Sequence, residues 1–302
     1  MVQQRRKLSQ SKHAFVLTLA ASFLLSGCGS EDGEAAPIVM DGPSITTGEG
    51  AFATPQSTAR FLTQATFGPR PGQVSSLTGT SASSWFAQQL VMEPTFVQPE
   101  FEAYMALVEE IEEDGEESEL MFAAPSYVFW KQAIGAPDQL RLRMAFALSQ
   151  ILVVSDAGGE ILSDVPESMV EYQDILRSHA FGNYRDLLEA ITYNPAMGEW
   201  LTYMGILKAD ETGRVPDDNF ARVLLQLFSV GIVELQPNGE PRRQNGQPVE
   251  LYNNQDVTGL ARVFTGLDIA GLDRQQFPSL VDAVGEVDDL GENFLRPMTF
   301  ID

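Results

Sequence analysis

DQLRLRMAFALSQILVV, residues 138–154, is the stretch that decides the fold class, because its apolar residues follow a helical period. Asp138 comes directly after Pro137 and belongs to the residue types that favour a helix N-cap. Arg141 and Arg143 fall on other faces of such a helix. We predict a long helix from Asp138 through about Val154. The apolar residues that recur at helical spacing are Leu140, Met144, Ala147, Leu148 and Ile151.

Similar helix signals occur on both sides of this stretch. Two turn signals, Pro-Asn-Gly at 237–239 and Asn-Gly at 245–246, predict a small hairpin. We therefore predict an all-α, multi-helix globular domain with at most a minor β-hairpin. The other predicted helices are Ser57–Thr66, Ser83–Leu90, one starting at Asn183, one at Asn194-Pro195, one from Asp217 or Asp218 to before Gly231, and one from Asn253 or Asn254 to about Thr265.

The N-terminus has the layout of a bacterial lipoprotein leader. Four basic residues precede an apolar run from Ala14 to Leu25, which is too short for a bilayer span of about 20 residues. The sequence Leu-Ser-Gly-Cys at 25–28 then resembles a lipobox, in which Cys28 receives a diacylglycerol and becomes the new, acylated N-terminus. We predict a signal peptide at 1–27, a flexible tether at 28–53 and the helical domain at 54–302.

The predicted location is therefore a membrane. In this prediction the protein is exported, and a lipid anchor on Cys28 then attaches it to the membrane. Gly29 follows this cysteine in place of Asp, so the sequence lacks the inner-membrane retention signal of enterobacteria. We expect the outer membrane, facing the periplasm or the cell surface, if the host is Gram-negative. Two alternatives stay open, namely a plain signal peptide with an incidental cysteine and export by the twin-arginine route, which the Arg5-Arg6 pair invites.

Composition and charge exclude several classes of function. Loss of the leader would leave 15 basic and 42 acidic residues, a formal charge of −27, which repels nucleic acid and anionic headgroups. We expect no nucleic-acid partner. Cys28 is the sole cysteine and His179 the sole histidine outside the leader, so thiolate and multi-histidine metal sites are excluded within one chain. No G-x-S-x-G, G-x-G-x-x-G or P-loop pattern occurs either, and we predict no metal and no cofactor.

Residues 100–119 form an acidic segment with ten carboxylates and neither Lys nor Arg. One interpretation is a cation-binding patch. No D-x-[DN]-x-[DN]-G pattern orders these oxygens, so we favour a solvated face.

Six sequence blocks, taken in order, carry a family resemblance. They are ARFLTQATFG (59–68), DQLR through SQ (138–150), HAFGNYRDLL (179–188), PAM (195–197), PDDNFAR with LLQLF (216–228) and QDV with ARVFTG (255–266). Together they resemble the bacterial family labelled domain of unknown function 1800, over about residues 54–267. The resemblance implies a largely helical, exported protein without an established activity. Genes of this family often neighbour those of a sulfatase-like exported family, number 1501 in the same naming, which implies a secreted partner.

Three departures from the family pattern affect this interpretation. Val223 stands where the family usually has an acidic residue, and Leu267 where it usually has Trp. Family members also generally continue into a second half, whereas this sequence stops at Asp302. One hypothesis is therefore a truncated member that lacks the C-terminal half and leaves apolar surface uncovered.

Polar residues near two predicted helix starts form the candidate site. Asp218 and Arg222 are four residues apart and share a helix face. Asp256 opens the next helix, and paired carboxylates can divide acid and base roles or hold a cation. The alternative, which we favour, is that these residues cap and lock helices, and that the histidine is structural. The candidate polar site comprises Asp217, Asp218, Asn219, Arg222, Asp256, Arg262 and His179.

Three hypotheses for function follow. The first is a lipid-anchored binding or scaffold module that works with a secreted partner, and the lack of any catalytic motif favours it. The second is a hydrolase-like enzyme that uses carboxylates around Asp218 and Asp256. The third is an inactive, truncated fragment. Catalytic residues are not assigned in any of the three.

Overall fold

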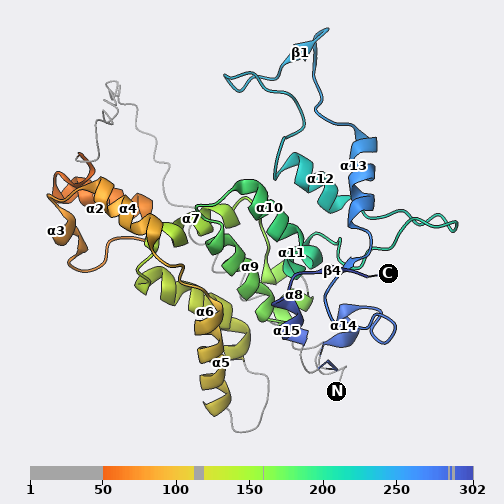
Figure 1. Cartoon of the computed structure of the whole chain (residues 1–302), viewed down its shortest axis with the longest axis horizontal. Coiled ribbons are helices and arrows are strands. Elements are labelled where there is room, and N and C mark those ends of the chain that lie inside the picture. Colours follow the sequence, from red (N-terminus) through yellow and green to blue (C-terminus); the bar gives the residue numbers. More distant parts are fainter. Residues whose placement is uncertain (1–49, 112–118, 159, 285, 288–289, 302) are drawn as a thin grey trace, which may run out of the picture. The chain divides into compact units, whose positions relative to one another are not determined.

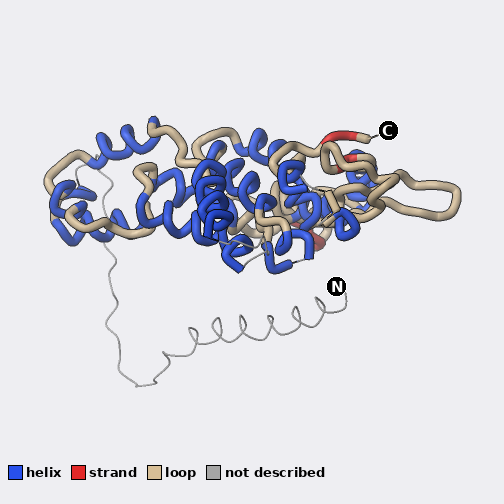
Figure 2. Tube along the Cα trace, turned by 90° about the horizontal axis from the view of Figure 1, so that it is seen from below, coloured by secondary structure: helices blue, strands red, loops and turns tan. Residues whose placement is uncertain are grey.

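Helices make up most of the chain that the structure describes (Figure 1, Figure 2). The computed structural model describes residues 50–111, 119–158, 160–284, 286–287 and 290–301. The predicted signal peptide, nearly all of the predicted tether and part of the acidic segment lie outside these residues. Within them, fourteen α-helices accompany two small antiparallel sheets, so the predicted all-α class is confirmed. Among the described helices, none has the length and apolar character needed to cross a membrane.

Two helices, α7 (Gln139–Ser149) and α9 (Glu167–Ser178), pack against each other. The helix predicted at 138–154 is thus present but ends earlier. The apolar residues that recur at helical spacing do not form its buried face, because Met144 and Ile151 are exposed. The helix carries apolar residues on nearly all of its faces, so their spacing alone does not show which face is buried. The residues that α7 buries are Gln139, Arg141, Leu142 and Ala145.

Asp138 occupies the N-cap position of α7 but does not cap the helix. Its carboxylate makes no hydrogen bond to the first turn of α7, a fully described segment. It instead accepts hydrogen bonds from the backbone N–H (2.8 Å) and the hydroxyl (2.6 Å) of Thr95. The predicted capping role is therefore wrong, and the buried side chain connects α7 to a distant loop.

The N-terminal helices surround a small aromatic cluster. Phe52 and Trp85 are buried there with their ring centroids 6.4 Å apart, edge to face. The helix predicted from residue 57 starts two residues earlier, at Pro55, because proline suits the first helical turn and Thr54 caps it. The elements are η2 (Gly50–Phe52), α2 (Pro55–Ala65), α3 (Gln73–Leu77), α4 (Ala82–Val91), α5 (Gln98–Ile111) and α6 (Glu119–Gly135).

The largest apolar core lies among the later helices. Tyr203 stacks on Phe220 with ring centroids 3.9 Å apart, and Phe264 packs against both rings. The buried Tyr203 hydroxyl donates to the carbonyl of Thr192 at 2.9 Å, so its polar atom is satisfied. The elements are η3 (Asp156–Gly158), α8 (Glu160–Asp164), α10 (Tyr184–Thr192), α11 (Pro195–Trp200), α12 (Asn219–Gln226), α13 (Asn254–Ala261), η4 (Arg262–Phe264), α14 (Leu280–Ala283) and α15 (Leu290–Phe294).

Three of the predicted helix starts are confirmed by their caps. The side chains of Asn183, Asn194 and Asn253 each accept a hydrogen bond from a backbone N–H in the first turn of α10, α11 and α13. Two of the later helices are shorter than predicted. Helix α12 stops at Gln226, and α13 gives way to the 3-10 turn η4 after Ala261.

The predicted hairpin is present and very short. Strand β1 (Arg243–Gln244) pairs with β2 (Gln247–Pro248) in antiparallel register. Asn245 and Gly246 make the turn with φ angles of 53° and 84°, the positive values that an Asn-Gly turn adopts readily. A second sheet, which the sequence analysis did not predict, joins β3 (Leu267–Asp268) to β4 (Thr299–Phe300).

Candidate functional site

Helix α9 borders two cavities, each on a different face of the helix. Side chains three or four residues apart share a helix face. Ten residues of α9, counting its C-cap His179, therefore form two groups of five, one at each cavity. The aromatic cavity, of about 250 Å³, is lined on α9 by Met169, Tyr172, Gln173, Leu176 and Arg177. The polar cavity, of about 540 Å³, is lined on α9 by Glu171, Asp174, Ile175, Ser178 and His179.

Asp174 anchors the loop between α4 and α5 to helix α9. Its two carboxylate oxygens accept hydrogen bonds from the backbone N–H groups of Val97 (2.6 Å) and Gln98 (3.0 Å). Burial raises the pKa of Asp174, while these two donors and nearby Arg177 oppose the rise. The carboxylate is thus committed to holding a loop whose residues border the polar cavity.

Arg177 holds the same loop from the other face of α9. Its Nη1 donates to the carbonyl of Thr95 at 2.6 Å and to the amide oxygen of Gln132. The amide nitrogen of Gln132 in turn donates to the carbonyl of Phe96 at 2.8 Å. Burial lowers the pKa of Arg177, and the nearby carboxylates of Asp174 and Asp138 oppose this decrease. These contacts place the ring of Phe96 at the polar cavity.

The polar cavity has a size and lining that suit a small molecule. Its volume falls within the range of about 300–1,000 Å³ that is usual for ligand pockets. Phe96 and Tyr193 contribute aromatic rings, and Glu189 and Arg296 contribute exposed charged side chains. The cavity therefore combines apolar wall area with several hydrogen-bonding groups.

Asn194 brings a buried and unsatisfied donor to the polar cavity. Its Oδ1 accepts a hydrogen bond from the backbone N–H of Met197 at 3.1 Å, which caps α11. Its Nδ2 is fully buried and has no hydrogen-bond partner among the described residues, and the whole residue is only 1% exposed. A buried donor without a partner destabilises the fold by about 1–3 kcal/mol, so an acceptor inside the cavity would be bound favourably.

His179 presents one ring nitrogen to a helix carbonyl. Its Nδ1 lies 2.9 Å from the carbonyl oxygen of Ile175. Because a carbonyl only accepts, Nδ1 carries the proton, and Nε2 of the neutral ring is left as an acceptor. No described residue donates to Nε2, so this lone pair is available to a molecule in the polar cavity.

Glu171 is the carboxyl group of this cavity with the most altered acidity. Burial, and secondarily the charge of Asp174, raises the pKa of Glu171 to about 7. Its side chain makes no ion pair or hydrogen bond with any described residue. Near neutral pH the group exists in both protonation states, so it can donate or accept a proton. A titratable group with a strongly shifted pKa inside a cavity is typical of a functional site.

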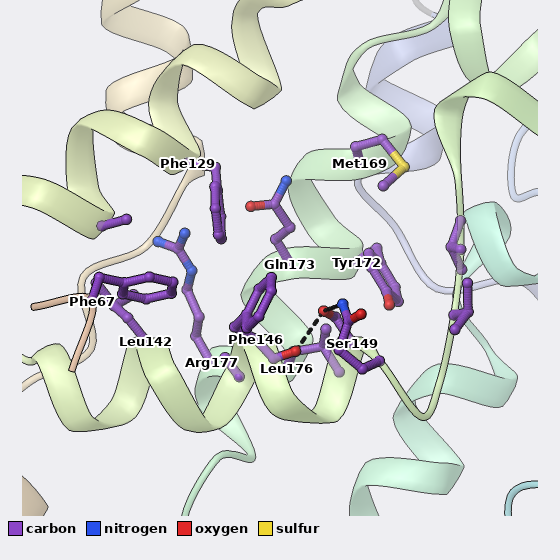
Figure 3. Close-up of a pocket in the computed structure, with 15 residues that line it drawn as sticks. Phe67, Phe129, Leu142, Phe146, Ser149, Met169, Tyr172, Gln173, Leu176 and Arg177 are labelled. Carbon is purple, nitrogen blue, oxygen red and sulfur yellow. Dashed lines mark hydrogen bonds between the residues drawn. The ribbon is translucent and has the colours of Figure 1, made fainter. Parts of the chain in front are cut away.

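The aromatic cavity on the other face of α9 is built differently (Figure 3). Phe67 from the loop after α2, Phe129 from α6 and Phe146 from α7 gather opposite the side chains of α9. The centroid of Phe67 lies 5.8 Å from that of Phe129 and 5.7 Å from that of Phe146. The polar side chains of Gln173 and Arg177 also line this apolar space.

Four of the residues predicted as a polar site meet at the starts of α12 and α13. Asp218 forms the expected ion pair with Arg222 at 2.7 Å, and Arg222 also donates to Oδ1 of Asn254 at 3.4 Å. Asp217 accepts a hydrogen bond from the backbone N–H of Asn219 at 2.8 Å. Asp217 also accepts from the hydroxyl of Thr202 at 3.2 Å, and Nδ2 of Asn219 donates to the carbonyl of Leu201 at 3.4 Å. The four side chains thus make helix-start contacts, one exposed ion pair and two bonds to the loop after α11.

The three remaining predicted residues are spread over other positions. Asp256 accepts from the backbone N–H of Asn253 at 2.8 Å and completes the capping box of α13. Arg262 begins η4, is exposed, and its side chain bonds to no described residue. His179 lines the polar cavity, whereas the other six predicted residues line neither cavity. No group of three or more His, Cys, Asp and Glu side chains within the described ranges is arranged to hold a metal ion.

Sequence reasoning missed most of the residues around the polar cavity. It assigned no helix to residues 167–178 and treated Asn194 only as a helix cap. A usable signal was present, because Glu171, Asp174 and Arg177 interrupt an otherwise apolar helical period. Charged residues within a core helix need partners, and searching for these partners leads to the cavity.

Taken together, the fold and the site define a mainly helical protein with two cavities along one core helix. The chain belongs to the family described as protein of unknown function (DUF1800), whose match covers residues 60–298. The resemblance found in the six sequence blocks is thereby confirmed. No curated protein and no solved structure matches the chain.

Proposed function

We propose that this chain is an exported, lipid-anchored binding protein whose polar cavity takes a small neutral ligand rich in hydroxyl groups, such as a carbohydrate. One observation carries the proposal, namely the buried Nδ2 of Asn194, which has no partner among the described residues and belongs to a residue of the cavity lining. A hydroxyl oxygen that accepts from Nδ2 would remove a penalty of about 1–3 kcal/mol. Ligand binding thus gains from a donor that the described residues leave without a partner.

Several other groups around the cavity require donors from the ligand, whereas exposed Arg296 is itself a donor. Nε2 of neutral His179 is an acceptor, and the carboxyl groups of Glu171 and Glu189 accept when they are ionised. A hydroxyl group both donates and accepts, so it satisfies these groups and Asn194 together. An ammonium group has no lone pair for the Asn194 donor, and an anion meets three carboxyl groups, of Glu171, Asp174 and Glu189, against the single cation of Arg296. A neutral, polyhydroxylated molecule is therefore favoured over either charged class.

The aromatic rings in the lining support the same class of ligand. Phe96, which is 39% exposed, and the partly buried Tyr193 offer flat apolar faces beside the polar groups. Sugar rings likewise combine an apolar C–H face with a rim of hydroxyl groups. Aromatic side chains with polar neighbours provide such mixed surfaces.

The membrane address and the partner belong to the same proposal. We infer that Cys28 carries the lipid anchor and that the tether at 28–53 holds the helical domain near the outer membrane. A secreted, sulfatase-like protein is the proposed partner, by analogy with the family's gene neighbours. In this arrangement the helical domain would hold a carbohydrate-like molecule for the partner at the cell envelope.

Calorimetric titration with matched sugars tests the ligand class. Neutral monosaccharides and disaccharides are compared with glucosamine and glucuronate, which place one positive or one negative charge on the same kind of ring. We expect a neutral sugar to bind and Asn194→Asp to weaken it by about tenfold or more, since Asp keeps the capping oxygen but loses the donor. Asn183→Asp is the matched control, because it changes an exposed cap outside the cavity. Preference for a charged sugar would contradict the proposal.

A second candidate function is acid–base hydrolysis in the same cavity. The observation that favours it is Glu171, whose pKa of about 7 suits a general acid at neutral pH. Nε2 of His179 is an acceptor in the same cavity and would serve as the base. Under this hypothesis Glu171→Gln abolishes release of nitrophenol from aryl glycosides while sugar binding persists. No release by the unaltered protein would leave binding as the function of the cavity.

A further inference from the structure

The aromatic cavity is large enough for a molecule with one aromatic ring. Its volume of about 250 Å³ exceeds the roughly 150 Å³ of an apolar cavity that holds benzene. Phe67, Phe129 and Phe146 form one side of it, and Leu142 and Ala145 are buried in the wall. A space of this kind favours ring-to-ring contacts with an apolar guest.

A buried cation without a paired carboxylate lies in this apolar wall. Arg177 is 2% exposed and lines the cavity. No carboxylate of the described residues lies within 4.0 Å of its guanidinium. Asp138 and Asp174 influence its pKa, but both are already hydrogen-bonded to backbone N–H groups of the loop between α4 and α5.

The guanidinium of Arg177 also retains unused donors. Arginine has five N–H donors, and in this chain only Nη1 makes hydrogen bonds with described residues, to Thr95 and Gln132. Nε and Nη2 are therefore available to an acceptor inside the cavity. Desolvating a charged group is costly unless the group is paired, so an anion bound here would be stabilised.

Gln173 adds a second polar group to the lining of this cavity. It precedes Arg177 by one helical turn on the same face of α9, and in Figure 3 the ends of the two side chains lie on either side of the Phe129 ring. Its Oε1 is fully buried and has no hydrogen-bond partner among the described residues. The other atom of this amide, Nε2, is a donor and makes no hydrogen bond with the described residues, so it can meet an acceptor on a ligand.

We propose that the aromatic cavity binds a small aromatic carboxylate, with its ring among Phe67, Phe129 and Phe146 and its carboxylate on Arg177 and Gln173. One carboxylate oxygen accepts from the free N–H groups of Arg177, and the other accepts from Nε2 of Gln173. The ligand thus supplies the paired negative charge that this buried cation lacks. The aromatic cavity shares no lining residue with the polar cavity, so this proposal does not depend on the proposed carbohydrate site.

Access to the aromatic cavity is open at one end. Gln150 and Val153 line the cavity and are exposed, whereas Leu142, Leu176 and Arg177 are buried. A carboxylate entering past the end of α7 therefore meets aromatic and aliphatic side chains before it reaches the cation. This order places the apolar ring of the ligand beside the phenylalanines.

Calorimetric titration of the purified protein at pH 8 tests the assignment with two probes of one shape. The probes are 3-phenylpropionate and its neutral amide, 3-phenylpropanamide. We expect the acid to bind, and the amide to bind about tenfold or more weakly, because only the acid pairs with Arg177. Equal affinities, or no binding of the acid at about 1 mM, would overturn the proposal.

Gln173→Glu tests the same assignment without disturbing the loop contacts. The new carboxylate has the shape of the amide and lies one helical turn before Arg177. It would pair with the guanidinium in place of the ligand's carboxylate. We expect affinity for 3-phenylpropionate to fall about tenfold or more, and to fall by more than affinity for the amide does, because only the acid competes with the new carboxylate for Arg177. The matched control is Gln64→Glu, an exposed position on α2. An unchanged affinity for the acid in Gln173→Glu would also overturn the proposal.

Discussion

At the scale of single residues, two carboxyl groups one turn apart on α9 acquire different roles from their surroundings. Burial raises the pKa of both Glu171 and Asp174. Asp174 gains two backbone donors, from Val97 and Gln98, which stabilise its charge and tie it to a loop. Glu171 gains no such partner among the described residues, so its pKa reaches about 7. The same helix thereby carries one structural and one titratable carboxyl group.

Glu171→Gln is predicted to stabilise the protein at alkaline pH. With an ordinary pKa of 4.5 and a folded pKa of about 7, the folded state binds more protons between these values. The stability contributed by Glu171 is therefore full below about pH 4.5 and is lost as pH rises through 7. We expect the variant to exceed the unaltered protein by about 1–2 kcal/mol at pH 8, discounted because solvent reaches this carboxyl, and to match it near pH 4.5.

Urea unfolding of both proteins at a series of pH values measures this difference. The midpoint difference should grow between pH 5 and 7.5 and then level off, with little change in the slope of the unfolding free energy. A difference that stays constant with pH would show that Glu171 does not titrate near neutrality.

Asp174→Ala is predicted to destabilise the protein strongly. Two backbone N–H groups, of Val97 and Gln98, would lose their acceptors at a buried position. We expect a loss of about 2–4 kcal/mol in unfolding free energy, measured by urea denaturation. Asp217→Ala is the matched control and should lose about 1 kcal/mol or less, because its contacts with the backbone of Asn219 and the hydroxyl of Thr202 are exposed. Equal losses would argue against the anchoring role of Asp174.

At the scale of elements, the sequence predicted where helices begin better than which face they bury. Asn183, Asn194 and Asn253 cap helices as predicted, because capping is a local interaction between neighbours in the chain. The buried face of α7 does not follow from its apolar spacing, because its apolar residues lie on nearly all sides. Asp138 failed as a cap because a tertiary partner, Thr95, competes for its carboxylate. A local capping signal thus predicts the cap correctly unless a distant residue forms hydrogen bonds with the capping side chain.

Asp256→Ala is predicted to weaken α13 without affecting ligand binding. The substitution removes the bond from the backbone N–H of Asn253 and one half of the capping box. We expect a loss of about 0.5–1 kcal/mol by urea denaturation and unchanged sugar affinity. Lost binding with full stability would instead favour the polar site predicted around Asp218 and Asp256.

At the scale of the whole molecule, the fold class and the family followed from the sequence, but the cavities did not. Helix periods and six ordered blocks are visible in one dimension, and both predictions are confirmed. The polar cavity joins α9, the end of α10, and loops around Phe96 and Arg296, which are far apart in the chain. The contact between these segments depends on tertiary packing, which the sequence does not show directly. Among the residues that line the polar cavity, only His179 was predicted as a candidate site residue.

Cys28→Ser is predicted to release the protein from the membrane. The thiol accepts the lipid in the proposed pathway, so its loss removes both the anchor and the cleavage before residue 28. We expect the unaltered chain to sediment with membranes and to incorporate labelled palmitate, and the variant to do neither. Labelled palmitate in the variant would contradict the assignment of Cys28.

A thermal melt followed by far-ultraviolet circular dichroism tests the fragment hypothesis. A chain that completes its own core should lose helical signal in one cooperative transition. We expect this result, because a core cluster that includes Tyr203, Phe220 and Phe264 is buried by the described residues themselves. A broad transition with dye-binding apolar surface would support an incomplete domain.

The most direct measurement for the polar cavity is the nuclear magnetic resonance signal of the Asn194 side-chain amide, assigned by its disappearance in Asn194→Asp. If the cavity binds a neutral sugar, the two Nδ2 protons should shift and exchange more slowly when the sugar is added, since they gain a hydrogen bond. The amide of Asn183 should stay unchanged under the same conditions. Saturating sugar that leaves the Asn194 signal in place would mean that this cavity is not the binding site.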